Sequence, residues 1–357
     1  MIKLDDEILK PKEFSNNDVA AFEANDVRQD IRKTERQILS AKENETDAIV
    51  SLGRPQWAGR AETRVRGKLW DFNACGLPKV WTYYGARGAG VNVHVLDTGV
   101  DMNHTAFAHC ADRMQTRSFV PSYSGDRDGA GHGTWVVGKI VGAGIGIAPQ
   151  AKMHSHKVLD DSGSGRMSFT NNALEWILEQ EDMPHVINMS LGGAYPSARL
   201  NKLVWKLYKR GALVIVAAGN EDSDAPCYPA HCDGVVAVAA VNKRKARAWF
   251  SNYGGNIDIS APGVACYSTY PGENFRLLQG TSMASPTVAG LVTLGVSHAL
   301  QRGHDEGPGM RDMILKALET SAEDLGDVGK DPLYGVGCIH GGQFFEKLHE
   351  SLLALGL

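Results

Sequence analysis

Gly280-Thr281-Ser282-Met283-Ala284-Ser285-Pro286 opens a long apolar segment and places one serine hydroxyl at its beginning. The apolar pattern continues through residues 287–292, which predicts a buried helix that starts near Ser282. Pro286 suits this position, because a missing backbone donor does least damage near the first turn of a helix. The start of a helix also presents unpaired N–H groups and a positive dipole end. Ser282 is therefore expected beside groups that stabilise negative charge.

Two upstream segments carry an acid and a base. Asp97 ends an apolar run over residues 91–96 that is typical of a buried parallel strand. His132 lies in Gly131-His132-Gly133-Thr134, just before residues 135–141, which predict a buried helix. The chain order Asp97, His132, Ser282 is one of the orders that recur among serine hydrolases.

These residue types suit nucleophilic attack on a carbonyl. A serine hydroxyl needs a neighbouring base, for which His132 is the candidate. Asp97 can accept a hydrogen bond from the imidazole and so fix its tautomer. Asn220 follows another predicted buried strand, over residues 213–218. Its side chain and the Ser282 backbone amide are the candidate oxyanion hole, which predicts a serine peptidase.

Each of these signals is weak when it stands alone. An Asp-Thr-Gly after a strand commonly marks only a turn, a single histidine is more often structural, and an asparagine at a strand end is often a cap. The four together, each at a strand end or a helix start, favour the catalytic interpretation. The alternation of strands and helices predicts an α/β fold with a mainly parallel central sheet between helices.

The chain resembles the subtilisin-like serine peptidases, the subtilases, over about residues 75–345. Three further segments carry this resemblance: Val186-Ile187-Asn188-Met189-Ser190-Leu191-Gly192-Gly193, Phe250-Ser251-Asn252-Tyr253-Gly254 and Ser260-Ala261-Pro262-Gly263. It implies a subtilisin-like three-layer α/β/α fold, the triad of Asp97, His132 and Ser282, and Asn220 as oxyanion donor.

The resemblance also implies a groove for a polypeptide substrate, in which two edge strands flank an extended peptide. The matching edge residues are Ser164 and Gly165 on one side and Ser190, Leu191 and Gly192 on the other. The resemblance makes Ala217, Ala218 and Gly219 a wall, and Cys227 the floor, of the pocket for the residue before the scissile bond. None of these is charged, so an apolar or medium-sized residue is expected there. Without the resemblance, Ser164 and Gly165 would be interpreted as a polar turn.

Some positions depart from the pattern of close relatives. Trp135 stands where they usually carry a second histidine, and Val137 stands where a small alanine is common. Both changes predict altered packing rather than lost chemistry. The stretch from Val141 to Pro149 is shorter than in relatives that bind calcium tightly, and Ala106 replaces a needed carboxylate. No cofactor is expected, no metal site is indicated, and weaker calcium sites made of carbonyl oxygens remain open.

Composition favours one catalytic domain with an extension. The 357 residues carry a formal net charge of −4, with an isoelectric point near 6.3. Neither nucleic acid nor an anionic membrane is an expected partner. No run of eighteen apolar residues predicts a membrane span. We expect an N-terminal extension over residues 1–73 and a catalytic domain over residues 74–357, closed by an amphipathic helix from Gly341 to Leu357.

The extension has its own pattern. From Asn16 to Ala48 it is charged and free of proline and glycine, with an imperfect helical stripe of apolar residues. A helix or helical pair is expected there. Because subtilases often carry N-terminal prosegments, the resemblance implies a prosegment that inhibits the enzyme intramolecularly; the alternative is a helical extension used for packing or dimerisation. Met1 to Glu7 lacks the apolar core of a secretory signal. An intracellular, cytoplasmic location is expected if Met1 is the natural start, and secretion remains open.

Two questions stay open at this level. The six cysteines could form bridges in an oxidising compartment or remain thiols in a reducing one, and no Cys or His spacing favours zinc. The triad predicts an endopeptidase that forms an acyl-enzyme. A transpeptidase or macrocyclase, in which an amine intercepts that intermediate, and a catalytically silent peptide-binding relative are the alternatives.

Overall fold

The structure is a computed structural model that describes residues 48–51, 54–55, 69–121, 123, 127–225 and 227–357. The helical stripe expected from Asn16 to Ala48 lies outside these residues, except for Ala48 itself, which begins a strand.

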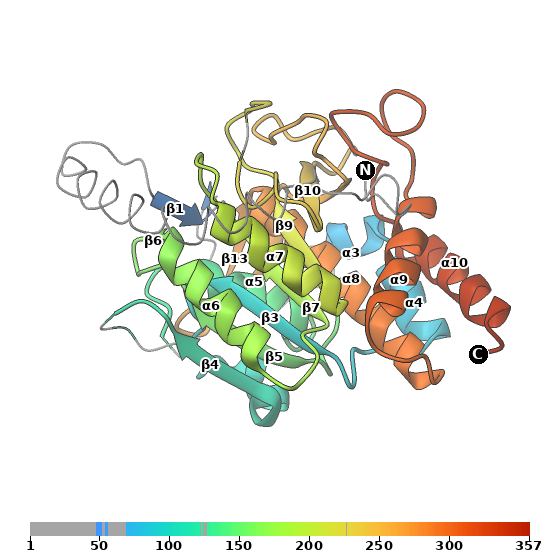
Figure 1. The fold of residues 1–357 in the computed structure, drawn as a ribbon, viewed down its shortest axis with the longest axis horizontal. Coiled ribbons are helices and arrows are strands. Elements are labelled where there is room, and N and C mark those ends of the chain that lie inside the picture. The colour runs from blue at the N-terminus through green and yellow to red at the C-terminus, as the bar shows by residue number, and fades with distance from the viewer. Residues whose placement is uncertain (1–47, 52–53, 56–68, 122, 124–126, 226) are drawn as a thin grey trace, which may run out of the picture.

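A seven-stranded sheet forms the centre of the protein (Figure 1). All of its neighbouring strands pair in parallel. Its order across the sheet is β11 (Ile259–Pro262), β10 (Val235–Val241), β9 (Leu213–Ala217), β7 (Val186–Met189), β3 (Asn92–Asp97), β5 (Lys152–Lys157) and β4 (Met114–Ser118). Because parallel strands point the same way, the carboxyl ends of β3, β7 and β9 meet at one edge.

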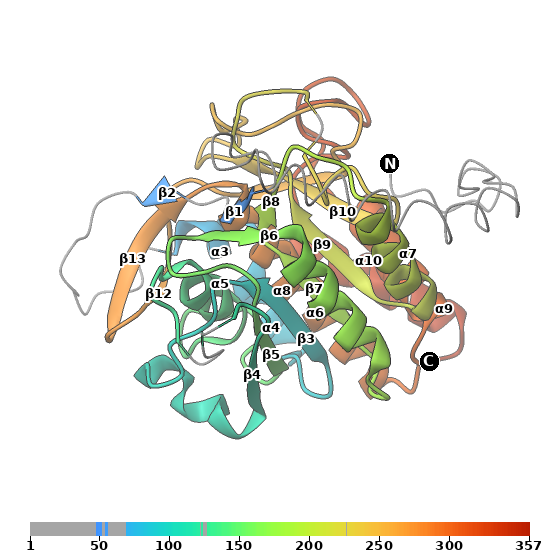
Figure 2. The same cartoon turned by 60° about the vertical axis from the view of Figure 1, so that its left-hand side comes forward.

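Helices cover both faces of this sheet, as Figures 1 and 2 show. Side chains alternate along the strands: Leu213 and Ile215 join the larger core cluster, whereas Val214 and Val216 join the smaller one. The larger cluster includes α5 (His132–Val141) and α8 (Thr281–Gln301), and the smaller one includes α6 (Met167–Glu179) and α7 (Ala198–Arg210). The predicted three-layer α/β/α fold is therefore confirmed.

The other helices surround the α8 side of the sheet or connect the strands. They are α3 (Trp70–Ala74), α4 (Leu77–Tyr83), the 3₁₀ helix η3 (Thr105–Arg113), α9 (Pro308–Thr320) and α10 (Gly341–Ala354). Helix α10 is the expected closing helix, with Phe344, Phe345 and Leu348 fully buried.

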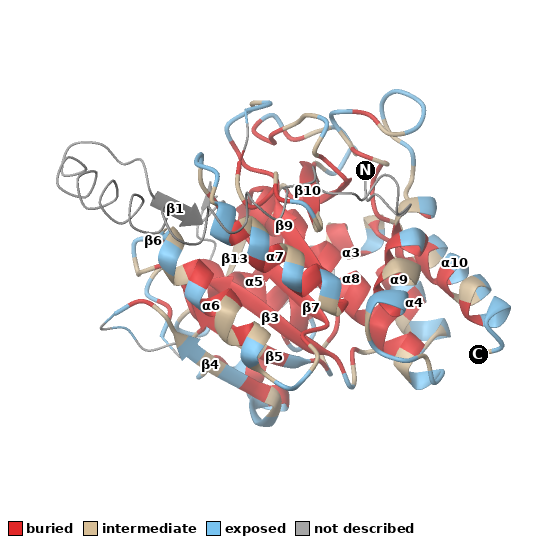
Figure 3. Ribbon diagram, in the orientation of Figure 1, coloured by how far each residue is buried: buried red, intermediate tan, exposed pale blue. Residues whose placement is uncertain are grey.

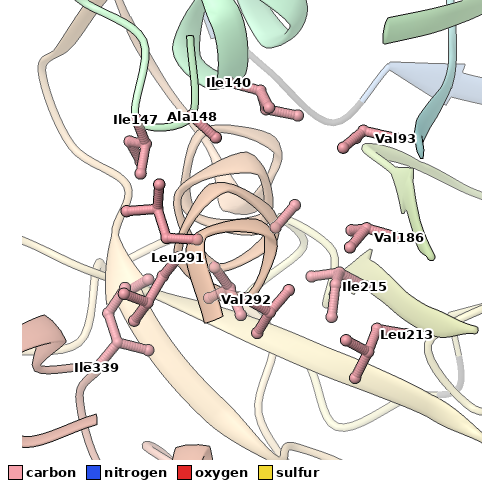
Figure 4. Close-up of a cluster of buried hydrophobic side chains, with 14 of the residues drawn as sticks. Val93, Ile140, Ile147, Ala148, Val186, Leu213, Ile215, Leu291, Val292 and Ile339 are labelled. Carbon is pink, nitrogen blue, oxygen red and sulfur yellow. The ribbon is translucent and has the colours of Figure 1, made fainter. Parts of the chain in front are cut away.

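Helix α8 runs through the interior, where burial is most complete (Figure 3). Figure 4 shows Val186 and Ile215 of the sheet on the Val292 side of this helix, while Leu291 points toward Ile147 and Ile339. By length and composition α8 could cross a membrane, but 94% of its apolar window is buried inside this fold. Its composition is therefore that of a core helix.

Two smaller antiparallel sheets lie beside the central one. One has the order β6 (Ser164–Arg166), β1 (Ala48–Ser51), β8 (Leu191–Gly192). The other has the order β12 (Cys266–Tyr270), β13 (Asn274–Gln279), β2 (Arg54–Pro55). Both therefore take a strand from the N-terminal extension.

An ion pair that is closed to solvent joins α3 to α5. The ammonium group of Lys139 lies 2.5 Å from a carboxylate oxygen of Asp71, and both side chains are 0% exposed. Lys139 also donates a hydrogen bond of 3.1 Å to the carbonyl oxygen of Tyr267 and lies 4.5 Å from the ring centre of Phe72. Helix α3 is thus fastened to α5, the helix that begins at His132.

The six cysteines are all buried free thiols. Burial raises the pKa of Cys110 to about 11 and the pKa values of Cys227, Cys232 and Cys338 to about 12. These thiols are protonated at neutral pH and poorly reactive.

Three histidines stack inside the sheet on the neighbouring strands β3 and β5. The ring centre of His94 lies 4.5 Å from that of His154 and 5.2 Å from that of His156. Nδ1 of His94 and Nε2 of His156 share a hydrogen bond of 2.9 Å. Burial, and then the neighbouring histidines, hold the pKa of His94 well below its usual range. Burial lowers the pKa of His154 and brings that of His156 to about 3.

This cluster predicts loss of stability in mild acid. Between about pH 6.5 and pH 3 the unfolded chain takes up a proton that the buried His156 ring does not bind in the folded protein, so stability falls as the pH falls. His156 should contribute a slope of about 1.4 kcal/mol per pH unit, and the lowered pKa values of His94 and His154 act in the same direction. Urea unfolding between pH 7.5 and pH 5 measures it. His156→Gln should flatten the slope, whereas His109→Gln, at an exposed position, should not; equal slopes in all three proteins would contradict the prediction.

Candidate active site

The carboxyl edge of the central sheet brings the predicted residues together. Asp97 is the last residue of β3, and His132 is the first residue of α5. Asn220 follows β9 after two residues, and Ser282 is the second residue of α8. This edge is where open parallel sheets generally bind ligands.

A direct hydrogen bond joins the predicted acid and base. Nδ1 of His132 lies 2.8 Å from Oδ1 of Asp97, and the two residues are 5% and 0% exposed. The same carboxylate oxygen accepts a bond of 2.7 Å from the Thr98 backbone N–H. Among the described residues, Nε2 of His132 has no hydrogen-bond partner. The ring is therefore held through Nδ1, and Nε2 is the nitrogen left to exchange a proton.

The glycines on either side of His132 are required by the backbone. Gly131 has φ of 85°, a left-handed conformation that favours glycine. A Cβ on Gly133 would lie 2.1 Å from the carbonyl oxygen of Gly99. The first turn of α5 thus packs directly against the turn that follows Asp97.

The hydroxyl of Ser282 points toward the edge strand that follows β7. Its Oγ donates a hydrogen bond of 2.9 Å to the carbonyl oxygen of Ser190. The carbonyl oxygen of Ser282 accepts a bond of 3.1 Å from Oγ of Ser190. This second bond replaces the helical one that Pro286, four residues later, has no N–H to make. Pro286 is the sixth residue of α8, somewhat deeper than the first turn.

The amide of Asn220 is oriented by the residue before Ser282. Oδ1 of Asn220 accepts hydrogen bonds from the backbone N–H of Thr281 at 2.9 Å and from its hydroxyl at 3.1 Å. This network identifies the amide oxygen, so the NH₂ group lies on the side away from Thr281. An NH₂ donor fixed in this way is what a preorganised oxyanion hole requires.

A buried asparagine that the sequence reasoning did not assign to the site connects β7 to α8. Oδ1 of Asn188 accepts a bond of 2.7 Å from the hydroxyl of Ser285, and its Nδ2 donates to Oγ of Ser190 at 3.0 Å. In the sequence, Asn188 is the one polar residue within the apolar strand over residues 186–189, and that isolated amide could have indicated a role for it at the site. This network holds α8 in register with the edge strand.

The predicted groove residues form the two edges of one small sheet. Ser164 and Gly165 lie in β6, while Leu191 and Gly192 form β8 and Ser190 precedes it. Strand β1 pairs antiparallel with both, and Val50 lies opposite Ser164 on one side and Gly192 on the other. Backbone of the chain's own extension therefore occupies the space between the two edges.

The predicted pocket residues are only partly brought together. Ala217 and Cys227 form one small buried cluster, whereas Ala218 packs with Ala239 and Ile257. Gly219 donates its N–H to the Thr281 hydroxyl at 3.1 Å. The pKa of Cys227 is raised chiefly by burial and then by Glu221, so the candidate floor is an uncharged thiol.

Trp135 is fully buried beneath the site, and its indole N–H donates to the carbonyl oxygen of Arg276 in β13 at 2.9 Å. Val137 is also fully buried.

The carbonyl oxygen of Ala106 accepts a bond from the Ala143 N–H at 2.9 Å, so Ala106 lies beside the short loop after α5. Across the described ranges, no group of three histidine, cysteine or acidic side chains is arranged to hold a metal ion.

The chain is similar to known proteins over most of this fold. A profile described as the subtilase family matches residues 88–337. "Subtilisin DY" of Bacillus licheniformis is 38% identical over 265 residues, which cover 72% of this chain and 91% of that protein. "Subtilisin Savinase" of Lederbergia lenta is 39% identical over 266 residues, with the same two shares. "M-protease" of Shouchella clausii is 39% identical over 266 residues, covering 72% of this chain and 64% of that protein.

Proposed function

Because the chain belongs to the subtilase family and is a serine endopeptidase, we propose that it hydrolyses polypeptides through Asp97, His132 and Ser282. The observation that carries this assignment is the 2.8 Å bond between His132 and Asp97 at the sheet edge where α8 presents Ser282. The polypeptide substrate follows from the family and from relatives that are named as proteases.

In the proposed reaction, the Ser282 hydroxyl leaves the Ser190 carbonyl and turns to Nε2 of His132. His132 takes the proton as Oγ attacks the peptide carbonyl, and then gives it to the leaving amine. The Asp97 carboxylate orients the ring and stabilises the imidazolium. Water then hydrolyses the acyl-enzyme.

The negative charge on the carbonyl oxygen would be met by the Ser282 backbone N–H and the NH₂ group of Asn220. The N–H of Ser282 is among the first N–H groups of α8, which have no acceptor within the helix. Two such fixed donors stabilise the charged intermediate more than the neutral substrate.

Labelling with a fluorophosphonate tests this assignment. Wild-type protein should gain one adduct by intact mass, because only an activated serine reacts, and Ser282→Ala should gain none. Ser297→Ala is the matched control, since Ser297 lies on the same helix and donates to the carbonyl of Ala89. Labelling of Ser282→Ala would place the nucleophile elsewhere. If the wild-type protein is not labelled even after removal of the N-terminal extension, the chain is the catalytically silent peptide-binding relative.

Product masses separate hydrolysis from transpeptidation. Hydrolysis adds one water to each cleaved bond, whereas a ligated or cyclised product lacks that water. We propose hydrolysis, because nothing in the triad selects an amine over water.

We further propose that the N-terminal extension is an inhibitory prosegment. Strand β1 fills the space between β6 and β8, where an extended substrate would add its backbone hydrogen bonds. Ser51 lies opposite Leu191, next to Ser190. Arg54 lies opposite Gln279, three residues before Ser282. Both described strands therefore pair with segments that adjoin Ser282.

The cut in this prosegment is therefore proposed between Ser51 and Arg54. The intact-mass measurement described above reads it directly. Wild-type protein should lose about fifty residues and acquire a new N-terminus between residues 52 and 54, whereas Ser282→Ala should stay intact. A stable full-length chain that is nevertheless labelled would contradict the prosegment proposal while leaving the catalytic one unchanged.

A further inference from the structure

Asp128 is a buried carboxylate just before α5, and each of its partners within the described part of the chain is a donor. It is 5% exposed. Its Oδ1 accepts from the Thr98 hydroxyl at 2.8 Å and from the Gly131 N–H at 2.7 Å. Its Oδ2 accepts from the N–H of Thr134 at 2.8 Å and from the Thr134 hydroxyl at 2.7 Å.

The two threonine hydroxyls extend this network in two directions. Oγ1 of Thr98 also accepts the Gly133 N–H at 2.8 Å. Oγ1 of Thr134 also accepts the Asp101 N–H at 2.9 Å. Through Thr98 and Thr134, Asp128 ties the turn that follows Asp97 to the first turn of the helix that starts with His132.

We propose that Asp128 is a positioning residue that sets the place of the His132 imidazole relative to Asp97. The proposal rests on the proposed roles of those two residues. Gly131 and Gly133 are the direct chain neighbours of His132, and one is bonded to Asp128 while the other is bonded to Thr98. A displacement of about 1 Å in a reacting group can cost about a hundredfold in rate. A clamp on both sides of the histidine therefore acts directly on catalysis.

A carboxylate is the group that this position requires. Four donors converge on two oxygens, so an asparagine would turn an NH₂ group against two of these donors. Burial raises the pKa of Asp128, while the bonds from Thr134, Gly131 and Thr98 oppose that rise. The Asp128 carboxylate therefore uses both oxygens to accept these four hydrogen bonds. It contacts the chain neighbours of His132 rather than the reacting atoms themselves.

The test compares Asp128→Asn with Asp331→Asn in the processed enzyme. Asp331 is a matched control, since it is 6% exposed and its carboxylate accepts backbone N–H groups from Asp327, Leu333 and Tyr334 in a loop near the C-terminus. We expect Asp128→Asn to lower kcat by about 10- to 100-fold with little change in KM. Its acid limb of kcat/KM against pH, which reports protonation of the base, should move to lower pH.

Thr98→Val separates position from charge. It keeps the Asp128 carboxylate but removes the hydroxyl that links Asp128 to Gly133, so a shift of the acid limb in both variants indicates altered geometry. If Asp128→Asn does not fold, Thr98→Val alone tests the proposal. The inference is overturned if Asp128→Asn and Thr98→Val lose only thermal stability, like Asp331→Asn, with kcat per labelled serine and the acid limb unchanged. Failure of the proposed function is distinct, because the wild type itself would then not be labelled.

Discussion

The Ser282→Ala variant should lose about 10⁶-fold in kcat for peptide hydrolysis, and Asp97→Asn should lose roughly 10⁴-fold. Without Oγ no acyl-enzyme can form, and only the oxyanion donors and the groove continue to assist attack by water. Asn at position 97 can present an NH₂ group to Nδ1 of His132 and so favour the wrong tautomer. Because the groove is untouched, KM should stay within a few-fold of wild type. The values of kcat and KM are measured with a chromogenic peptide amide as substrate and with protein that lacks the N-terminal extension.

The double variant sharpens this prediction. Groups that act as one unit are not additive, so Ser282→Ala with His132→Ala should be no slower than Ser282→Ala alone. Ser297→Ala should keep wild-type kcat. A His132→Ala enzyme that retains a tenth of the wild-type rate, or a double variant that loses the product of both effects, would remove His132 from its proposed role.

Breaking the ion pair between Asp71 and Lys139 should cost about 3–5 kcal/mol of unfolding free energy. Asp71→Asn leaves the Lys139 ammonium without its counter-charge where neither side chain reaches solvent. Replacement of both residues, as Asp71→Leu with Lys139→Met, should recover most of the loss, because apolar side chains of similar size satisfy such a site. Urea unfolding in the Ser282→Ala background avoids self-digestion during the measurement.

An exposed pair supplies the comparison. Lys347 and Glu350 lie 2.8 Å apart with side chains 46% and 64% exposed, and Glu350→Gln should change stability by less than about 1 kcal/mol. If Asp71→Asn were equally mild, the buried pair would not be what fastens α3 to α5.

Local patterns were sufficient to predict most of the fold. Asp97 could be placed at a strand end because residues 91–96 are continuously apolar, and Ser282 at a helix start because apolar residues and a proline follow it. The parallel sheet and the helices on both faces follow from the same kind of pattern and are confirmed. The helix expected from Gly341 to Leu357 is present as α10 and ends at Ala354. The catalytic roles of the residues that meet at the sheet edge stay predictions.

What the sequence did not predict depends on contacts between distant segments. Strands β1 and β2 are four and two residues long, and nothing in their periodicity indicates partners more than a hundred residues away. Asp71 and Lys139 each look like ordinary surface charges until the fold buries them together. Asp128 lies in a run rich in aspartate, glycine and arginine that is typical of a loop.

If the chain is cut between Ser51 and Arg54, as we propose, strand β2 has a consequence for the two new ends. The half that carries β1 can diffuse away, but the half that carries β2 cannot, since thirteen residues join Pro55 to Leu69 and the anchored helix α3. A connection of that length would keep the new amino group near the acyl-enzyme, at an effective concentration of the order of millimolar. In this proposed processing, the amino group can re-form the peptide bond until water hydrolyses the acyl-enzyme. The freed β1 half still pairs with β6 and β8, so its dissociation is the later step that would open the groove.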